Sequence, residues 1–367
     1  MNIDQLDDSA LETLFLPFVA GQLAWPEEGA LFLRARNGWP VHAQPRPGLI
    51  CEQSFKPEAD ALQHAGLTLN TDGDGDAHNT KTYPLVLVLP PRQRDEARAL
   101  LARAVSLVKP GGRMMACLAN NEGARSSEAD LEKLVGSVHT LTKNKCRVFW
   151  SAPLHVAGHN TINAALLTQW RELDAVRAIE QGRFMSRPGV FAWDRIDLAS
   201  ALLARHLPNT LAGDAADLGA GFGYLSAELL ERCAGIKSLD VYEAEQRALA
   251  LARINLSTYE SRLAIEYYWH DVTIGLRRSY DVIVSNPPFH TQTRADRPDI
   301  GRRFIASAAQ SLNPGGQLWL VANRHLPYEQ ILNDSFGKVQ IIAEQQGFKI
   351  VAAVKARPIV TRTKNRT

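Results

Sequence analysis

The residues with the clearest chemical meaning lie in a short segment, SNPPFH, at positions 285–290. Two consecutive prolines fix the backbone and hold the preceding Asn286 extended, so the turn after this apolar strand is rigid. The Asn286 amide oxygen and the Pro287 carbonyl can each accept a hydrogen bond, and Phe289 offers a flat ring. This set suits an exocyclic amine on a planar base, with two acceptors for its hydrogens and a ring for stacking.

A glycine-rich segment, DLGAGFG at 217–223, follows an apolar strand and precedes a helical pattern. Glycines let the backbone turn tightly and approach a ligand, and the next helix offers unpaired N–H groups. Glu243 ends the following strand, where a carboxylate can accept from ribose hydroxyls, and Asp271 follows the third, where an acid can accept from an adenine amine. The sequence predicts an adenosine-containing cofactor held by Asp217, Gly219, Gly221, Gly223, Glu243 and Asp271.

Two cofactors fit such a glycine turn, a nicotinamide dinucleotide and S-adenosylmethionine. A dehydrogenase usually supplies a general acid such as His or Lys beside the nicotinamide, whereas SNPPFH presents an amide, a carbonyl and an aromatic ring. The segment therefore favours S-adenosylmethionine, with Asn286 at the meeting point of cofactor and substrate.

The elements that must position these residues follow from the hydrophobic pattern. Short β-branched runs alternate with helical stretches of roughly 10–15 residues, which is typical of parallel sheets covered by helices on both faces. In the C-terminal half we predict strands at 214–219, 238–243, 263–269, 280–285 and 317–322, and within 339–354.

The chain contains this pattern twice. YPLVLVLPP (83–91) is similar to YDVIVSNPP (280–288), and both are followed by a helical stretch, a Pro-Gly-Gly turn and another apolar strand. ALFLRARNG (30–38) can be laid over AADLGAGFG (215–223). The sequence therefore predicts an α/β fold of two tandem Rossmann-like modules, at residues 1–175 and 176–367, with 155–179 as the connector between them.

The two copies differ at the chemically important positions. Arg34 and Arg36 stand where the second copy has Gly219 and Gly221, and Leu89 stands where it has Asn286. A long side chain closes a position where backbone must approach a ligand, and leucine accepts no hydrogen bond. The N-terminal module is therefore predicted to be degenerate, an RNA-binding or scaffold domain without cofactor.

Composition sets the broad class. The 367 residues exceed the usual size of one hydrophobic core. The charges of the 41 basic and 39 acidic residues nearly cancel, and the basic excess lies in the C-terminal half.

Four cysteines without paired spacing favour a reducing cytoplasm and argue against a disulfide framework. The acidic N-terminus lacks a signal-peptide core and no long apolar run occurs, so we expect no membrane. We expect no metal, since a lone HVAGH (155–159) lacks a third ligand.

At this point a family resemblance can be stated. The C-terminal module resembles class I S-adenosylmethionine-dependent methyltransferases, in which Asn-Pro-Pro-Phe/Tyr marks enzymes that methylate nitrogen. PGVFAWDRIDLASALL (188–203), DLGAGFG, VSNPPFH, VANRHLPY (321–328) and the degenerate first module with NNEGARS (120–126) are similar to the bacterial ribosomal RNA guanine-N2 methyltransferases. NNEGARS and the C-terminal segment favour the small-subunit (16S) group over the large-subunit group, although ANRH occurs in the large-subunit group too.

The resemblance implies further residues and partners. Val190 and Phe191 are expected in the cofactor pocket, and Ala220 stands where the family often has Cys, a change harmless to cofactor binding. The expected product is S-adenosylhomocysteine, and the expected partner is ribosomal RNA or a ribosomal subunit, bound by a monomer. A paired base cannot reach such a pocket, so the guanine must be unpaired or flipped. Phosphate contacts are expected from basic residues near the strand ends: His290, Arg294, Arg297, Arg302, Arg303, Arg324 and His325.

Other functions remain open from the sequence. A methyltransferase of protein glutamine or DNA adenine also uses Asn-Pro-Pro with an aromatic residue. A non-catalytic RNA-binding assembly factor with a vestigial pocket is a further alternative, and the intact glycine turn, Glu243 and Asn286 argue against it.

Overall fold

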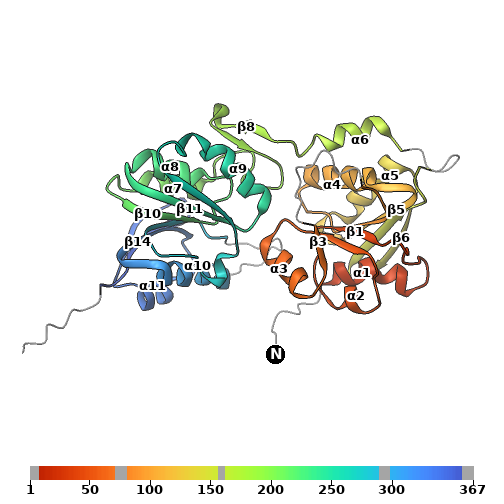
Figure 1. Cartoon of the computed structure of the whole chain (residues 1–367), viewed down its shortest axis with the longest axis horizontal. Coiled ribbons are helices and arrows are strands. Elements are labelled where there is room, and N and C mark those ends of the chain that lie inside the picture. The colour runs from red at the N-terminus through yellow and green to blue at the C-terminus, as the bar shows by residue number, and fades with distance from the viewer. Residues whose placement is uncertain (1–7, 71–80, 156–161, 289–297, 358–367) are drawn as a thin grey trace, which may run out of the picture. The chain divides into compact units, whose positions relative to one another are not determined.

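The computed structural model describes residues 8–70, 81–155, 162–288 and 298–357. The chain forms two compact units. The first comprises the chain up to Arg177 together with Arg187–Gly189, and the second comprises Ala178–Ser186 and the chain from Val190 onward. Within the described residues each unit contains one mixed sheet of seven strands with helices packed on it (Figure 1).

The elements of the first unit follow the predicted alternation of strands and helices. They are α1 (Ser9–Val19), β1 (Ala30–Leu33), α2 (Trp39–His42), β2 (Leu49–Glu52), α3 (Lys56–His64), β3 (Thr68–Asn70), β4 (Tyr83–Val88), α4 (Arg94–Ser106), β5 (Val108–Ala119), η1 (Asn120–Glu122), α5 (Ala124–Val135), β6 (Val138–Lys143), β7 (Cys146–Ser151) and α6 (Ala164–Arg171).

The second unit begins with a two-stranded ribbon and continues with the larger sheet. Its elements are β8 (Arg177–Ile179), η2 (Glu180–Gly182), β9 (Phe184–Ser186), α7 (Leu198–His206), β10 (Ala212–Leu218), α8 (Tyr224–Arg232), β11 (Gly235–Glu243), α9 (Gln246–Leu256), η3 (Ser257–Tyr259), β12 (Ala264–Trp269), η4 (Val272–Ile274), β13 (Tyr280–Ser285), α10 (Pro298–Ser311), β14 (Leu312–Asn323), α11 (Glu329–Ser335), β15 (Lys338–Gln345) and β16 (Phe348–Val354). Each strand predicted in this half is present.

The apolar run of β13 explains why this strand is central. Val282, Ile283 and Val284 are all at most 2% exposed. Val282 and Val284 belong to the core on one face of the sheet, and Ile283 belongs to the core on the other. A strand covered on both faces carries apolar residues at consecutive positions, as this one does.

The two sheets have the same topology and the same register. The first sheet has the strand order β3-β2-β1-β4-β5-β7-β6 and the second β12-β11-β10-β13-β14-β16-β15. Leu31 pairs with Val86 in the first sheet, and Ala216 pairs with Ile283 in the second. These are equivalent positions in the sequence alignment of the two copies, so the predicted duplication is confirmed at the level of strand register.

The equivalence extends to the backbone of the turn after the first central strand. Arg34 has φ +52° and Gly219 has φ +72°. A left-handed arginine is uncommon because its Cβ crowds the backbone. The first unit therefore keeps the shape of the glycine turn with an arginine in it, and the guanidinium of Arg34 pairs with Glu96 at 3.2 Å.

The segment predicted to be a simple connector, 155–179, belongs in part to the first unit. Helix α6 packs against α4, and Trp170 is 4% exposed. The guanidinium of Arg98 lies 5.0 Å from the centre of the Trp170 ring. This stretch was predicted as a connector within the range of the first module, and its apolar positions form a helix face that packs there.

Two further findings concern the described residues alone. None of their helices is both long and apolar enough to cross a membrane. They also contain no group of three or more His, Cys, Asp or Glu side chains that could hold a metal ion.

Candidate functional site

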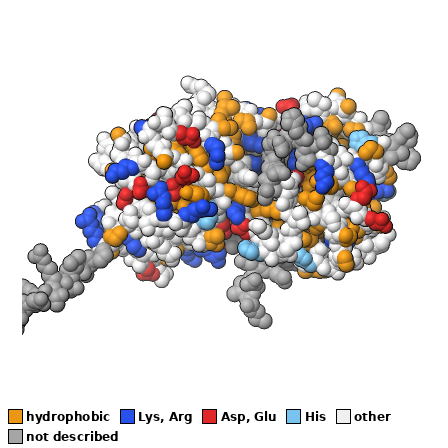
Figure 2. Space-filling model, in the orientation of Figure 1, with side chains coloured by type: hydrophobic (Ala, Val, Ile, Leu, Met, Phe, Trp, Pro, Cys, Tyr) orange, Lys and Arg blue, Asp and Glu red, His pale blue; other side chains and the backbone are white. Residues whose placement is uncertain are grey.

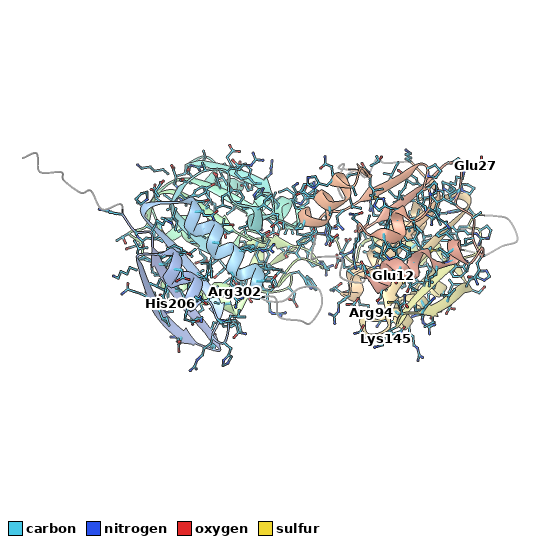
Figure 3. All side chains as sticks on the ribbon, turned by 90° about the horizontal axis from the view of Figure 1, so that it is seen from below. Glu12, Glu27, Arg94, Lys145, His206 and Arg302 are labelled. Atoms are coloured by element: carbon cyan, nitrogen blue, oxygen red, sulfur yellow. The ribbon has the colours of Figure 1, made fainter. Side chains whose placement is uncertain are left out.

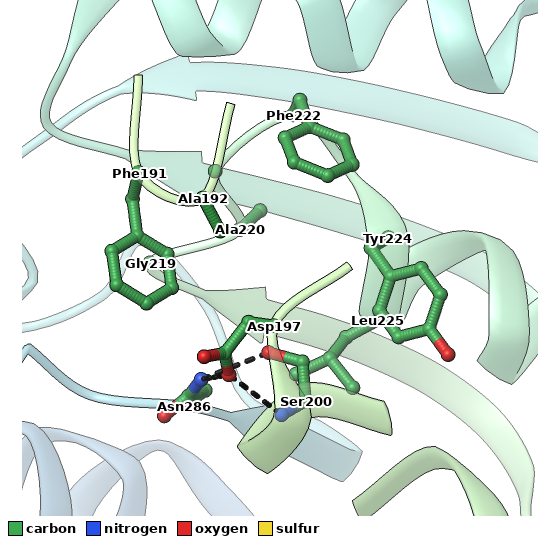
Figure 4. A pocket seen from close by; sticks show the side chains of 11 residues that line it. Phe191, Ala192, Asp197, Ser200, Gly219, Ala220, Phe222, Tyr224, Leu225 and Asn286 are labelled. Carbon is green, nitrogen blue, oxygen red and sulfur yellow. Dashed lines mark hydrogen bonds between the residues drawn. The ribbon is translucent and has the colours of Figure 1, made fainter. Parts of the chain in front are cut away.

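An open hollow of ≈ 410 Å³ lies where the carboxyl ends of β10 and β13 meet. Parallel α/β sheets bind ligands at this edge, because the loops after neighbouring strands converge there. Figure 4 shows the hollow with the side chains around it. Its lining residues are Phe191, Ala192, Asp197, Ser200, Gly219, Ala220, Gly221, Phe222, Tyr224, Leu225 and Asn286.

The glycine turn forms one wall of the hollow. Gly219, Gly221 and Gly223 have φ of +72°, +58° and +92°, a region that side chains rarely adopt. Gly219 N donates to the Tyr242 carbonyl at 2.9 Å. A Cβ at Gly221 would meet nothing within 4 Å, so the space in front of it is open.

Gly223 has a different role from the other two. It does not line the hollow, and a Cβ there would lie 3.3 Å from Cα of Ala252 in α9. Its small size therefore serves the close packing of the turn against a helix.

Glu243 holds the turn from the neighbouring strand. Its Oε2 accepts a hydrogen bond from Gly221 N at 2.7 Å, and its Oε1 accepts from Glu245 N at 2.8 Å. Burial raises the pKa of the Glu243 carboxyl, and the two backbone donors oppose that rise. Each carboxylate oxygen has a second lone pair, so Glu243 can still accept bonds from a ligand beside the turn.

Asp217 is buried at the end of β10, directly before the glycines. Its Oδ2 accepts from the Ser226 hydroxyl at 2.7 Å, while its Oδ1 has no hydrogen-bond partner. Burial raises the pKa of this carboxyl to about 7, because the charged form loses its hydration. A buried acceptor without a partner is costly. Asp217 and Glu243, both predicted to bind the cofactor, are not among the residues that line the hollow.

Asn286 lies opposite the glycine turn, at the end of β13. Its Nδ2 donates to Asp197 Oδ2 at 3.0 Å and to Ser200 Oγ at 2.8 Å, as the dashed lines in Figure 4 show. Its Oδ1 is buried and has no hydrogen-bond partner. The hydroxyl of the preceding Ser285 donates to the Leu218 carbonyl at 2.7 Å, which ties the N-P-P turn to the start of the glycine turn.

The two residues that the family resemblance placed in the cofactor pocket, Val190 and Phe191, lie in different environments. Phe191 lines the hollow, where Figure 4 draws its side chain, and it is 67% exposed. Val190 is 4% exposed, belongs to the hydrophobic core and is absent from the lining. Asp271 is absent from the lining as well, and its Oδ1 accepts from Thr273 N at 2.9 Å at the start of η4.

Only some of the residues predicted to contact phosphates lie in the part of the chain that the structure describes. Arg302 and Arg303 are exposed on α10, and Arg302 is labelled in Figure 3. Arg324 and His325 are exposed after β14, with Arg324 Nε 3.7 Å from Glu344. Basic and acidic side chains are mixed on the face seen in Figure 2. Four predicted residues lie outside the described residues: Phe289, His290, Arg294 and Arg297.

Sequence reasoning missed three polar residues that line the hollow: Asp197, Ser200 and Tyr224. A signal for the first pair exists, because an Asp three residues before a Ser at the start of an apolar helical pattern is a helix N-terminus. Asp197 indeed caps α7 by accepting from Ser200 N at 2.8 Å. This local pattern does not indicate that the capping Asp197 side chain faces Asn286, nearly ninety residues away.

Comparisons with known proteins agree with this geometry. The family model described as methyltransferase small domain matches residues 181–352. A solved T. thermophilus 16S rRNA N2 G1207 methyltransferase, in complex with AdoMet and guanosine, is 24% identical and has a TM-score of 0.75. That alignment covers 95% of this chain and 92% of that one, so both units have its fold. The fold is that of a class I methyltransferase.

Curated relatives identify the family within this class of methyltransferases. A ribosomal RNA small subunit methyltransferase C from Shewanella loihica is 30% identical over 281 residues, which is 76% of this chain and 79% of the relative. The protein of the same name from Psychromonas ingrahamii is 27% identical over 274 residues, covering 74% and 76%. This chain belongs to the ribosomal RNA small subunit methyltransferase C family.

The buried Asp217 leads to a pH prediction. Its folded-state pKa, about 7, lies above the usual 3.8, so the folded protein binds this proton more tightly than the unfolded chain. The stabilising contribution is complete below about pH 4 and is lost as the pH rises through about 7. We expect the free energy of unfolding, from urea titrations, to fall more between about pH 5 and pH 8 in the wild type than in Asp217→Asn.

The exposed Asp334, substituted to Asn, is the matched control, and its pH dependence should follow the wild type. An Asp217→Asn protein with the wild-type pH dependence would mean that the folded protein does not hold this proton.

Proposed function

We propose that this protein transfers a methyl group from S-adenosylmethionine to the exocyclic N2 amine of a guanine in small-subunit ribosomal RNA. The observation that carries the proposal is the amide of Asn286. It lines the same hollow as Gly219 and Gly221, and its oxygen is a buried acceptor without a partner. Such an acceptor on a rigid turn complements the hydrogens of an amine.

The described residues fit the cofactor. The left-handed Gly219 and the open Gly221 leave room for a ligand against the turn. Glu243 ends β11, where ribose hydroxyls would find an acceptor, and the unpartnered Oδ1 of Asp217 would accept from a donor group. When bound, the cofactor supplies an electrophilic methyl on a positively charged sulfur.

The protein's own contribution is positioning. The lone pair of a guanine amine is delocalised into the ring, so the amine is a poor nucleophile and must be held in line with the methyl. The Asn286 oxygen and the Pro287 carbonyl would accept its two hydrogens and favour the positive charge that develops on nitrogen. The Pro-Pro backbone keeps both acceptors fixed before the substrate arrives.

The N-terminal unit, in this proposal, binds no cofactor. Arg34 occupies the position of Gly219, with its guanidinium paired to Glu96, and the apolar Leu89 occupies that of Asn286. A unit with the same strand order but without the glycines or the acceptor is suited to a scaffold or RNA-contacting role.

The proposed partner is ribosomal RNA or a small ribosomal subunit, bound by a monomer in the cytoplasm. The exposed Arg302 and Arg303 would contact phosphates beside the hollow, together with Arg324 and His325. Because the target amine must enter the hollow, the guanine would be unpaired or flipped, at a cost of a few kcal/mol.

The first test removes the acceptor. Asn286→Ala should lower kcat for methylation of small-subunit RNA by about 10²–10³, the usual loss for one preorganised partner, with cofactor affinity nearly unchanged. Methylation would be followed with labelled cofactor, its position by mass mapping of the RNA, and affinity by calorimetry. Asn313→Ala is the control, since this amide bonds Asp281 at the opposite end of β13 and should leave kcat unchanged. Equal losses of kcat and affinity in Asn286→Ala would contradict the assigned role.

The second test converts the active turn into its degenerate counterpart. Gly219→Arg installs the residue of the first unit, and its side chain should fill the hollow and abolish cofactor binding. Calorimetry of the wild type should give one cofactor per chain, and Gly219→Arg should give none. Gly347→Arg is matched, because Gly347 is also left-handed, with φ +83°, and has nothing within 4 Å of its Cβ position. Residual binding of one cofactor by Gly219→Arg would place a site in the first unit.

The third test concerns the phosphate contacts. Replacing Arg302 and Arg303 by Ala should weaken RNA binding and lower the slope of log affinity against log salt by about 0.7 for each lost phosphate contact. Fluorescence anisotropy with a 16S RNA fragment at several salt concentrations measures both. Lys237→Ala is the control, because this exposed lysine lies near the beginning of β11, at the other edge of the sheet. An unchanged slope in the double variant would remove these arginines from the RNA contact.

A further inference from the structure

The Asn286 amide has a fixed orientation, and two residues of α7 set it. The amide lies 3.0 Å from Asp197 Oδ2 and 2.8 Å from Ser200 Oγ, both through its nitrogen. Asp197 Oδ2 also accepts from Ser200 N at 2.8 Å, so this oxygen acts as an acceptor on both sides. Because this oxygen already accepts from the Ser200 N–H, the NH2 group of the amide makes a hydrogen bond to it, whereas the amide oxygen would not.

This arrangement leaves one polar atom of the amide for a substrate. The hydrogen bonds to Asp197 and Ser200 both use Nδ2, and Oδ1 is buried without a partner. If the amide turned over, two oxygens would face each other across 3.0 Å and a donor would replace the acceptor. A donor at that place would repel an amine and would attract a carbonyl instead.

We propose that Asp197 is a positioning residue for methyl transfer. Together with Ser200, it orients the Asn286 amide so that the amide oxygen is left to accept a hydrogen bond from the substrate. This acceptor selects an amine over a carbonyl. The inference rests on the proposed function. It assigns Asp197 two tasks, because the same oxygen caps α7 and orients the amide. Side chains that orient a functional group typically change activity by roughly 10–100-fold when removed.

The central experiment is a double-substitution cycle on kcat, with small-subunit RNA as substrate. Asp197→Ala should lower kcat about 10- to 100-fold with little change in cofactor affinity. In the Asn286→Ala background the same change should lower kcat no further, because Asp197 acts through the amide. Ser200→Ala should give a smaller loss, since the charged partner remains.

Two variants separate positioning from helix capping. Asp197→Asn keeps an oxygen that can accept from both Ser200 N and Asn286 Nδ2, so it should restore most of the activity. Asn163→Ala removes the cap of α6 in the first unit, where Asn163 Oδ1 accepts from Leu166 N at 3.0 Å. It should lower the melting temperature as Asp197→Ala does, without the loss of kcat.

A readout independent of activity follows the amide itself. With 15N-labelled asparagine, the Asn286 side-chain NH2 signals, identified by their loss in Asn286→Ala, should exchange slowly with water in the wild type and rapidly in Asp197→Ala. Additive losses of kcat in the cycle, or slow exchange that persists in Asp197→Ala, would overturn the proposal. A wild-type protein that methylates no RNA, with amide exchange as expected, would refute the proposed function while the orientation of the amide stands.

Discussion

The pairing of β10 with β13 is the constraint on which the site depends. Both strands end at the same edge, with Leu218 opposite Ser285. The next residues are therefore Gly219 on one strand and Asn286 on the other, and the Ser285 hydroxyl joins the two turns at 2.7 Å from the Leu218 carbonyl. A slip of one residue would turn Ser285 and its neighbours to the opposite faces of the sheet and separate the two turns. The register is held by the buried Val282, Ile283 and Val284, so the core fixes the site.

The duplication shows that this constraint is necessary and not sufficient. The first unit has the same strand order and register, and even a left-handed backbone at Arg34. Its turn nevertheless carries an arginine paired with Glu96, and Leu89 follows the strand in place of an amide. Backbone topology supplies the edge of the sheet, and side chains decide whether that edge is open to a ligand.

The site also carries an energetic cost. Asp217 is a buried acid and Glu243 a half-buried one, and desolvation raises the pKa of both carboxyls. Asp217 Oδ1 and Asn286 Oδ1 are buried without hydrogen-bond partners. Unsatisfied buried acceptors typically cost about 1–3 kcal/mol each. Apolar residues at these positions would avoid this cost, so the buried polar groups are not explained by the stability of the fold.

Periodicity and turn chemistry were enough to predict the strands, the duplicated α/β fold and the two turns that meet at the pocket. Local rules suffice there, because apolar runs, glycines and prolines constrain the backbone wherever they occur. Helix α6 with its buried Trp170 was predicted only as part of a connector, and Val190, which the family resemblance placed in the cofactor pocket, lies in the hydrophobic core.

Only the folded chain shows that Asp197 and Ser200 turn the Asn286 amide so that its oxygen is left unpaired. The residue types at these three positions are plain in the amino-acid sequence. Which atom of an amide faces which neighbour depends on hydrogen bonds between segments distant along the chain, and such bonds exist only once the core has brought α7 beside the end of β13.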